Sequence, residues 1–60
     1  MDRIEKLYLI GLVNSEIENL EQDLERFESK ENKTDIDKVE IYHYKKDIDI
    51  YKNIIRELRE

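Results

Sequence analysis

The chain has 60 residues, of which 45% are charged and 38% hydrophobic, with one Gly and no Pro, Cys or Trp. Without cysteine there is no disulfide framework and no cysteine-based zinc site, so helix packing and self-association remain as the supports of so small a protein. A chain rich in Glu, Lys and Arg and poor in Gly and Pro is typical of helices. We therefore expect an all-α domain whose own core is small.

The sequence shows no membrane-spanning or targeting segment. Its longest apolar run, Leu7 to Val13, has seven residues and is interrupted by Gly11, whereas a membrane-spanning helix needs about 18 or more. The charges that precede this run cancel, which is not typical of a signal peptide. We expect a soluble, cytoplasmic protein that does not contact a membrane.

The first predicted helix covers about residues 2–30. Asp2, followed three residues later by Glu5, is typical of a helix N-terminus. Apolar residues then recur in alternating steps of three and four, the heptad pattern of a helix that packs through one seam. These residues are Ile10, Val13, Ile17, Leu20, Leu24 and Phe27. Gly11 lowers helix stability by about 1 kcal/mol relative to Ala, which hints at a close backbone approach there.

A polar loop at about residues 31–34 separates this helix from a second one at about residues 35–59. Thr34, with Asp37 three residues later, predicts the N-cap and acidic first turn of the second helix. The alternating apolar pattern returns in Ile41, Tyr44, Ile48, Tyr51, Ile55 and Leu58. A β-strand is the alternative for residues 39–51, where Ile and Tyr are frequent. Strict alternation fails within that stretch, so we favour the helix.

The two apolar patterns predict an antiparallel two-helix hairpin that resembles a short coiled coil. When the second helix folds back on the first, every seam residue meets one from the other helix without a slip in register. The expected layers are Phe27 with Ile41, Leu24 with Tyr44, Leu20 with Ile48, Ile17 with Tyr51, Val13 with Ile55 and Ile10 with Leu58. The expected charged neighbours are Glu28 with Lys38, Glu21 with Lys45 and Lys30 with Glu40, beside the like-charged Asp23 and Asp47.

A second apolar stripe lies to one side of the seam. It consists of Leu9, Leu12, Ile36, Val39, Ile50 and Ile54. At about 100° per residue, this stripe widens the apolar arc of the second helix to about half of its circumference. The hairpin brings Leu9 and Leu12 near Ile50 and Ile54, at the end away from the loop. We expect these four residues to join two copies into a homodimeric four-helix bundle, or to bind another helical protein.

The net charge of −5 arises between residues 16 and 31, since acids and bases balance in the rest of the chain. The acidic face of the first helix consists of Glu18, Glu21, Glu25 and Glu28. Direct binding of nucleic acid is disfavoured, because it needs a basic stripe that displaces phosphate counterions. The acidic face is either a solvated surface or, alternatively, a nucleic-acid mimic that inhibits a basic nucleic-acid-binding protein.

The sequence predicts no catalytic residue and no cofactor. His43 is the only histidine, and it follows Glu40 by three residues, which is a spacing found in metal-binding bundles of the ferritin type. Asp23 and Asp47 fall near them on the same side, so Glu40 and His43 are candidate metal ligands. Nucleophilic catalysis has less support, because cysteine is absent and no serine has a histidine within one helical turn.

The hairpin outline resembles the small sporulation aspartyl-phosphate phosphatases, whose second helix carries a Ser-x-x-x-Asp signature. Aligning Ile48-Asp49 with the end of that signature puts Lys45 at the position of the serine. In size and shape the hairpin is also similar to the plasmid copy-control RNA-binding hairpins, which dimerise into four-helix bundles. Because likeness of fold does not transfer function, the sequence predicts first a small non-enzymatic protein that acts through protein–protein interaction, as a homodimeric regulator or adaptor.

Overall fold

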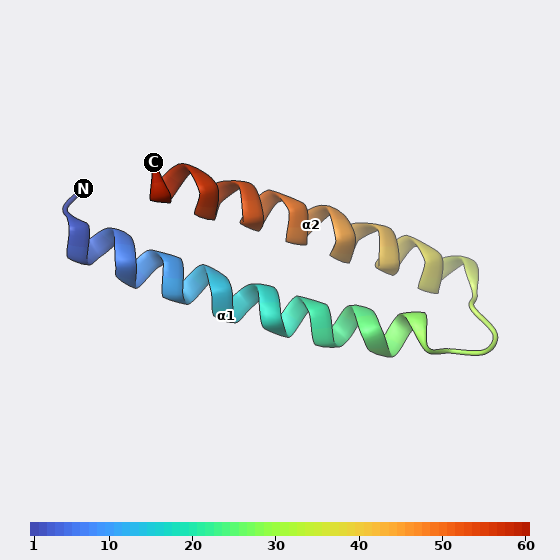
Figure 1. The fold of residues 1–60 in the computed structure, drawn as a ribbon. Helices are drawn as coiled ribbons and strands as arrows, with labels where there is room; N and C mark the ends of the chain where they lie inside the picture. The colour runs from blue at the N-terminus through green and yellow to red at the C-terminus, as the bar shows by residue number, and fades with distance from the viewer.

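The computed structural model describes all 60 residues as two α-helices joined by a short loop, with no strand. α1 covers Arg3–Glu28 and α2 covers Asp35–Arg59. The helices run antiparallel, so that both termini lie at one end of a rod and the loop lies at the other (Figure 1). The all-α helical hairpin is thereby confirmed, and the strand alternative for residues 39–51 is wrong.

Both helices begin at side-chain caps. The Asp2 carboxylate accepts a hydrogen bond from the backbone N–H of Glu5 at 2.7 Å. At the start of α2, the Thr34 hydroxyl accepts from the N–H of Asp37 at 3.1 Å, and the Asp37 carboxylate accepts from the N–H of Thr34 at 3.0 Å. This reciprocal capping box satisfies two backbone donors that a bare helix end would leave unpaired.

α1 ends at Glu28, slightly before the limit near residue 30 that the sequence indicates. Ser29 is the C-cap, and its backbone N–H donates to the carbonyl of Glu25 at 2.9 Å. The Ser29 hydroxyl also donates to the carbonyl of Arg26 at 3.0 Å. The first of these is the last i→i−4 bond of the helix, and the second satisfies a carbonyl of the last turn, after which the chain turns into the loop.

The seam between the helices is the core of the hairpin. All twelve predicted seam residues are buried or half-buried. Ile17, Ile48 and Ile55 are the most enclosed, with exposed fractions of 6%, 6% and 8%, and Tyr51 packs against the cluster that they form. Near the loop, the rings of Phe27 and Tyr44 lie 5.6 Å apart between centroids.

The charged pairs beside the seam differ from the sequence expectation. Lys45 lies 3.6 Å from Glu28, one heptad nearer the loop than Glu21, and Lys30 pairs with Asp37 at 2.9 Å rather than with Glu40. Side chains in a helix tilt toward its N-terminus. Lys45 on α2 therefore reaches toward the loop and Glu28 on α1 reaches away from it, which brings these two together. Lys30 lies beyond the end of α1 and pairs with the first turn of α2.

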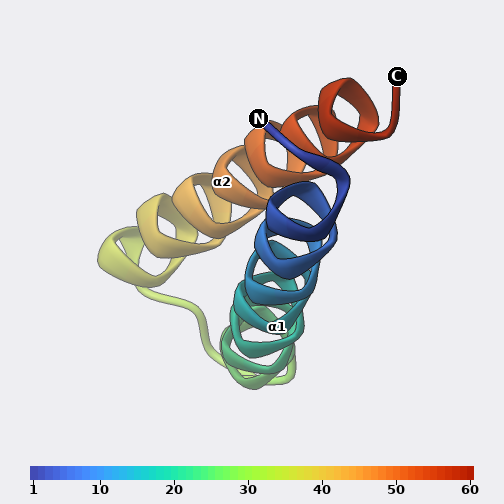
Figure 2. The same ribbon diagram turned by 90° about the vertical axis from the view of Figure 1, so that its left-hand side faces the viewer.

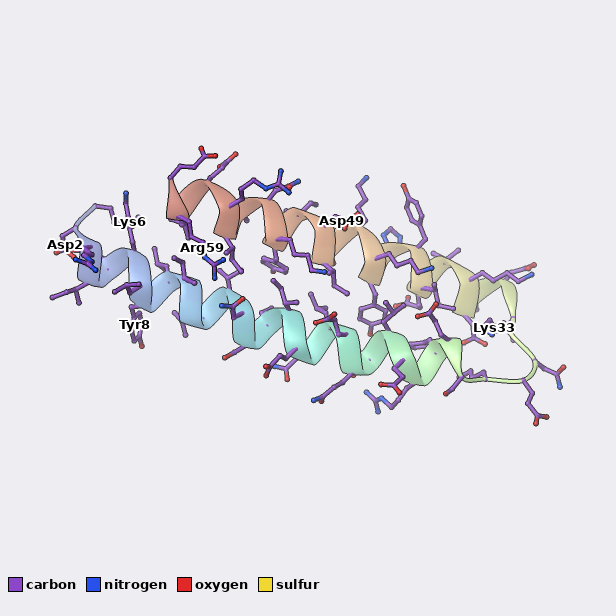
Figure 3. The ribbon with its side chains drawn as sticks, in the orientation of Figure 1. Asp2, Lys6, Tyr8, Lys33, Asp49 and Arg59 are labelled. Atoms are coloured by element: carbon purple, nitrogen blue, oxygen red, sulfur yellow. The ribbon has the colours of Figure 1, made fainter.

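The two helices are staggered. The first turns of α1 extend past the end of α2 (Figure 1), and viewed along the rod the helices cross at an inclination (Figure 2). Ile4 is 80% exposed, and the Tyr8 side chain projects away from α2 (Figure 3).

A side chain added at Gly11 would meet nothing within 4 Å, so the close backbone approach expected there is wrong.

Candidate interaction surfaces

The four predicted interface residues form what we call the apolar surface: Leu9, Leu12, Ile50 and Ile54. Leu9 is half-buried, while Leu12, Ile50 and Ile54 are 53%, 47% and 36% exposed. These side chains come from both helices at the end of the hairpin away from the loop. Isolated exposed apolar residues are common on protein surfaces, but a group that continues directly from the seam is typical of an interaction site.

The remainder of the second stripe is interrupted. Ile36 and Val39, in the first turns of α2, are exposed at 74% and 52%. His43 and Asp47 follow them along α2 toward Ile50, and both are exposed polar residues. The stripe is therefore apolar at its two ends and polar between them, and only its end away from the loop combines residues from α1 and α2.

The proposed pair of metal ligands lies on α2 without further ligands. Glu40 is half-buried and His43 is exposed, and the imidazole ring packs edge-on to Tyr42 with 5.7 Å between centroids. No group of three or more His, Asp or Glu side chains lies close enough together to hold a metal ion. The hairpin thus does not assemble Asp23 and Asp47 with Glu40 and His43 into a ligand set.

The four residues of the acidic face are all exposed. They are not isolated from positive charge, because α2 carries a row of basic residues on the same side of the hairpin. Glu18 and Glu21 line a groove of about 800 Å³ together with Lys52, Arg56 and Arg59. We call this side the charge-striped face. It consists of Glu18, Glu21, Glu25 and Glu28 on α1 and of Lys45, Lys52, Arg56 and Arg59 on α2.

The basic row was missed by the sequence analysis, although its spacing could have revealed it. Lys45, Lys52, Arg56 and Arg59 follow one another in steps of seven, four and three, which keep them on one side of a helix. Figure 3 shows the Arg59 side chain extending from α2 toward α1. A count of net charge hides such a row, because the aspartates and glutamates of α2 balance it, including Asp49, which lies within the row between Lys45 and Lys52.

A polar cluster closes the loop end of the seam. Asp37 is only 7% exposed. The Lys30 ammonium, which donates to its carboxylate, also lies 4.8 Å from the centroid of the Phe27 ring. The pKa of the Asp37 carboxyl is below its ordinary value, chiefly because the carboxylate accepts from the backbone N–H of Thr34 and then from Lys30. This cluster joins the loop to both helices.

Comparison of the chain with protein-family models, with curated proteins and with solved structures finds no match. Neither helix is long and apolar enough to cross a membrane. Function must therefore be argued from the two surfaces described above.

Proposed function

We propose that this chain is a small non-enzymatic protein that acts through protein–protein interaction, and that the apolar surface joins two copies into a four-helix bundle. The observation that carries the proposal is the exposure of Leu12, Ile50 and Ile54 beside a seam in which only three apolar residues are buried. The other nine seam residues are only half-buried in the hairpin. Burial of the apolar surface between two copies adds to the small apolar core that the hairpin has alone.

A second copy suits this surface because both helices contribute to it. A twofold axis brings the same four side chains of two copies together, so one patch serves both partners and the assembly is closed. The long, straight shape of the hairpin also suits a bundle, in which neighbouring helices pack over their full length. The bundle is the architecture that a regulator or adaptor would use to present its outer faces.

The acidic face supports the alternative of a nucleic-acid mimic less well. Glu28 already has Lys45 at 3.6 Å, and the groove beside Glu18 and Glu21 is lined by three basic residues. A mimic of a phosphate backbone needs a negative surface without such neighbours. The protein-interaction proposal is therefore preferred.

Sedimentation equilibrium at high salt, which screens surface charges, tests the proposal. The parent chain should be a dimer. The variant Ile54→Glu should dissociate at least tenfold more readily, because a carboxylate would enter a dry interface. Tyr8→Glu is the matched control, since it adds the same charge at a side chain that projects away from α2 (Figure 3), and it should behave as the parent does.

A parent chain that remains monomeric at high protein concentration would contradict self-association. The apolar surface would then be a docking site for a different helical protein. Circular dichroism of each variant checks that the helices are retained, so that a loss of assembly is not confused with a loss of fold.

A further inference from the structure

The charge-striped face carries opposite charges on its two helices. The row on α1 contains four glutamates and no base, and the row on α2 contains two lysines and two arginines, with Asp49 as one acid between Lys45 and Lys52. The rows run side by side, because residues of both line one groove whose apolar lining is Ile17 and Ile55. The face is therefore negative along one edge and predominantly positive along the other.

This face and the apolar surface lie on opposite sides of the seam. At about 100° per residue, Glu21 and Glu25 fall on one side of the Ile17 position in α1, and Leu9 and Leu12 fall on the other. The same holds in α2 for Lys52 and Arg56 against Ile50 and Ile54. None of the four residues of the apolar surface lines the groove. Both faces can thus be occupied at once.

Most charges of this face are unpaired within the chain. Lys45 with Glu28 is the one ion pair that joins the two rows, at 3.6 Å. The other pairs in the molecule are Arg26 with Asp23 and Lys30 with Asp37, and neither belongs to this face. Three glutamates and three basic residues of the face thus have no ion-pair partner within 4 Å, and they are free to meet opposite charges on another molecule.

We propose that the charge-striped face binds the charge-striped face of a second copy, with both loops at the same end of the assembly. Two twofold arrangements can place this face against itself. An axis along the helices sets the acidic row of α1 against the basic row of α2 in the second copy, and the reverse contact forms by symmetry. An axis across the helices sets glutamates against glutamates, which repel. The charge pattern therefore selects the first arrangement.

This contact goes beyond the proposed dimer and does not depend on it. If both faces are used, the apolar surface joins two hairpins into one bundle. Such bundles then associate with one another through their outer, charge-striped faces. The two contacts differ in their response to salt. Exposed charges are screened at high ionic strength, whereas burial of apolar side chains is not weakened by it. Salt should therefore separate the charged contact and leave the apolar contact intact.

Sedimentation equilibrium of the parent from about 25 mM to about 500 mM salt is the first test, over a range in which the screening length shortens severalfold. We expect assemblies larger than a dimer at low salt and dimers at high salt. A parent that stays a dimer at every salt concentration would overturn this inference and leave the proposed function standing. A dimer at low salt that becomes a monomer at high salt would support this inference and contradict the apolar dimer. A monomer throughout would contradict both.

Charge exchange is the second test. The variant Glu18→Lys with Glu25→Lys places two positive charges in the row of α1 and cancels its net negative charge. The variant Lys52→Glu with Arg56→Glu places two negative charges in the row of α2 and cancels its net positive charge. Each variant alone should lose at least tenfold in the low-salt association constant. An equimolar mixture of the two should recover it, because each reversed charge of one variant then faces an opposite charge of the other. A mixture that associates no better than either variant alone would overturn the proposal.

Two neutral variants, Glu18→Gln with Glu25→Gln and Lys52→Gln with Arg56→Gln, guard against loss of fold. They add no repulsion within the hairpin, and circular dichroism should show that they remain helical. Each should weaken the low-salt association, and mixing them should not restore it, since neither supplies a new opposite charge. Recovery on mixing the neutral pair would contradict an electrostatic contact.

Discussion

Lys30 and Asp37 form an ion pair across the loop, with 2.9 Å between the ammonium nitrogen and a carboxylate oxygen. The second oxygen of the same carboxylate accepts from the backbone N–H of Thr34 at 3.0 Å. Asp37 therefore caps α2 and holds the loop to it at the same time. The Lys30 ammonium is also positioned over the Phe27 ring at the end of α1, so the contact extends to the seam.

Thr34→Ala should lower the free energy of unfolding by about 1 kcal/mol, because it removes the acceptor for the Asp37 N–H. For a chain of this size, that loss corresponds to a melting temperature lower by about 4–8 °C. Thermal melting by circular dichroism measures it. Thr34→Ser, which keeps the hydroxyl, is the control and should stay close to the parent. Equal losses in both variants would show that the hydroxyl is not the cause.

Asp37 should make the hairpin less stable in acid. The pKa of its carboxyl is lowered in the folded chain, first by the hydrogen bond from the Thr34 backbone and then by Lys30. A lowered folded pKa contributes stability above the unfolded pKa of about 4, and this stability is lost as the pH falls through the lower folded value.

The comparison of the parent with Asp37→Asn isolates this contribution from that of the other acids. Urea unfolding near neutral pH should give the parent a higher free energy of unfolding than Asp37→Asn. This difference between the two should narrow as the pH falls below about 4. A difference that is constant with pH would contradict the assignment, since a carboxylate that titrates alike in both states adds no pH dependence.

The caps and the seam could be predicted because they depend on spacings of three and four residues along one helix. Thr34 and Asp37 meet through such a spacing, and so do the successive seam residues around Ile17. The partner of Lys45 could not be found in this way. It depends on the tilt of side chains on two antiparallel helices. Pairing residues only by their backbone position along the two helices ignores this tilt.

The two candidate surfaces also differ in whether the pattern along a single helix predicts them. The apolar surface was predictable because its residues extend a pattern on each helix, and their exposure beside the seam follows from the hairpin. The charge-striped face becomes visible only when two rows on different helices are placed next to each other. Arg56 and Arg59 contribute to it, although the pattern along α2 alone indicates no role for them beyond charge balance.

Gly11→Ala should stabilise the hairpin. Gly11 lies within α1, and an added methyl group would meet nothing within 4 Å. Alanine is more favourable than glycine in a helix interior by about 1 kcal/mol, so the melting temperature should rise by about 4–8 °C. Ser15→Ala, at an exposed position one turn further along α1, is the control and should give a smaller rise. A lower melting temperature for Gly11→Ala would place another helix against this glycine.

The melting temperature of the parent should depend on protein concentration. Only Ile17, Ile48 and Ile55 among the apolar residues are buried in one hairpin, so in the proposed dimer the fold and the assembly stabilise each other. A tenfold rise in concentration favours a dimer over separated, unfolded chains by about 1.4 kcal/mol, which corresponds to roughly 5 °C for two chains of this length. Thermal melting at high salt, at two concentrations tenfold apart, measures the shift without the charged contact.

Ile54→Glu should melt at a lower temperature that is the same at both concentrations, because its hairpins no longer meet through the apolar surface. Tyr8→Glu should retain the shift of the parent. If the parent melted at one temperature at both concentrations, its stability would reside in the single hairpin, and the apolar surface would be left for a different protein.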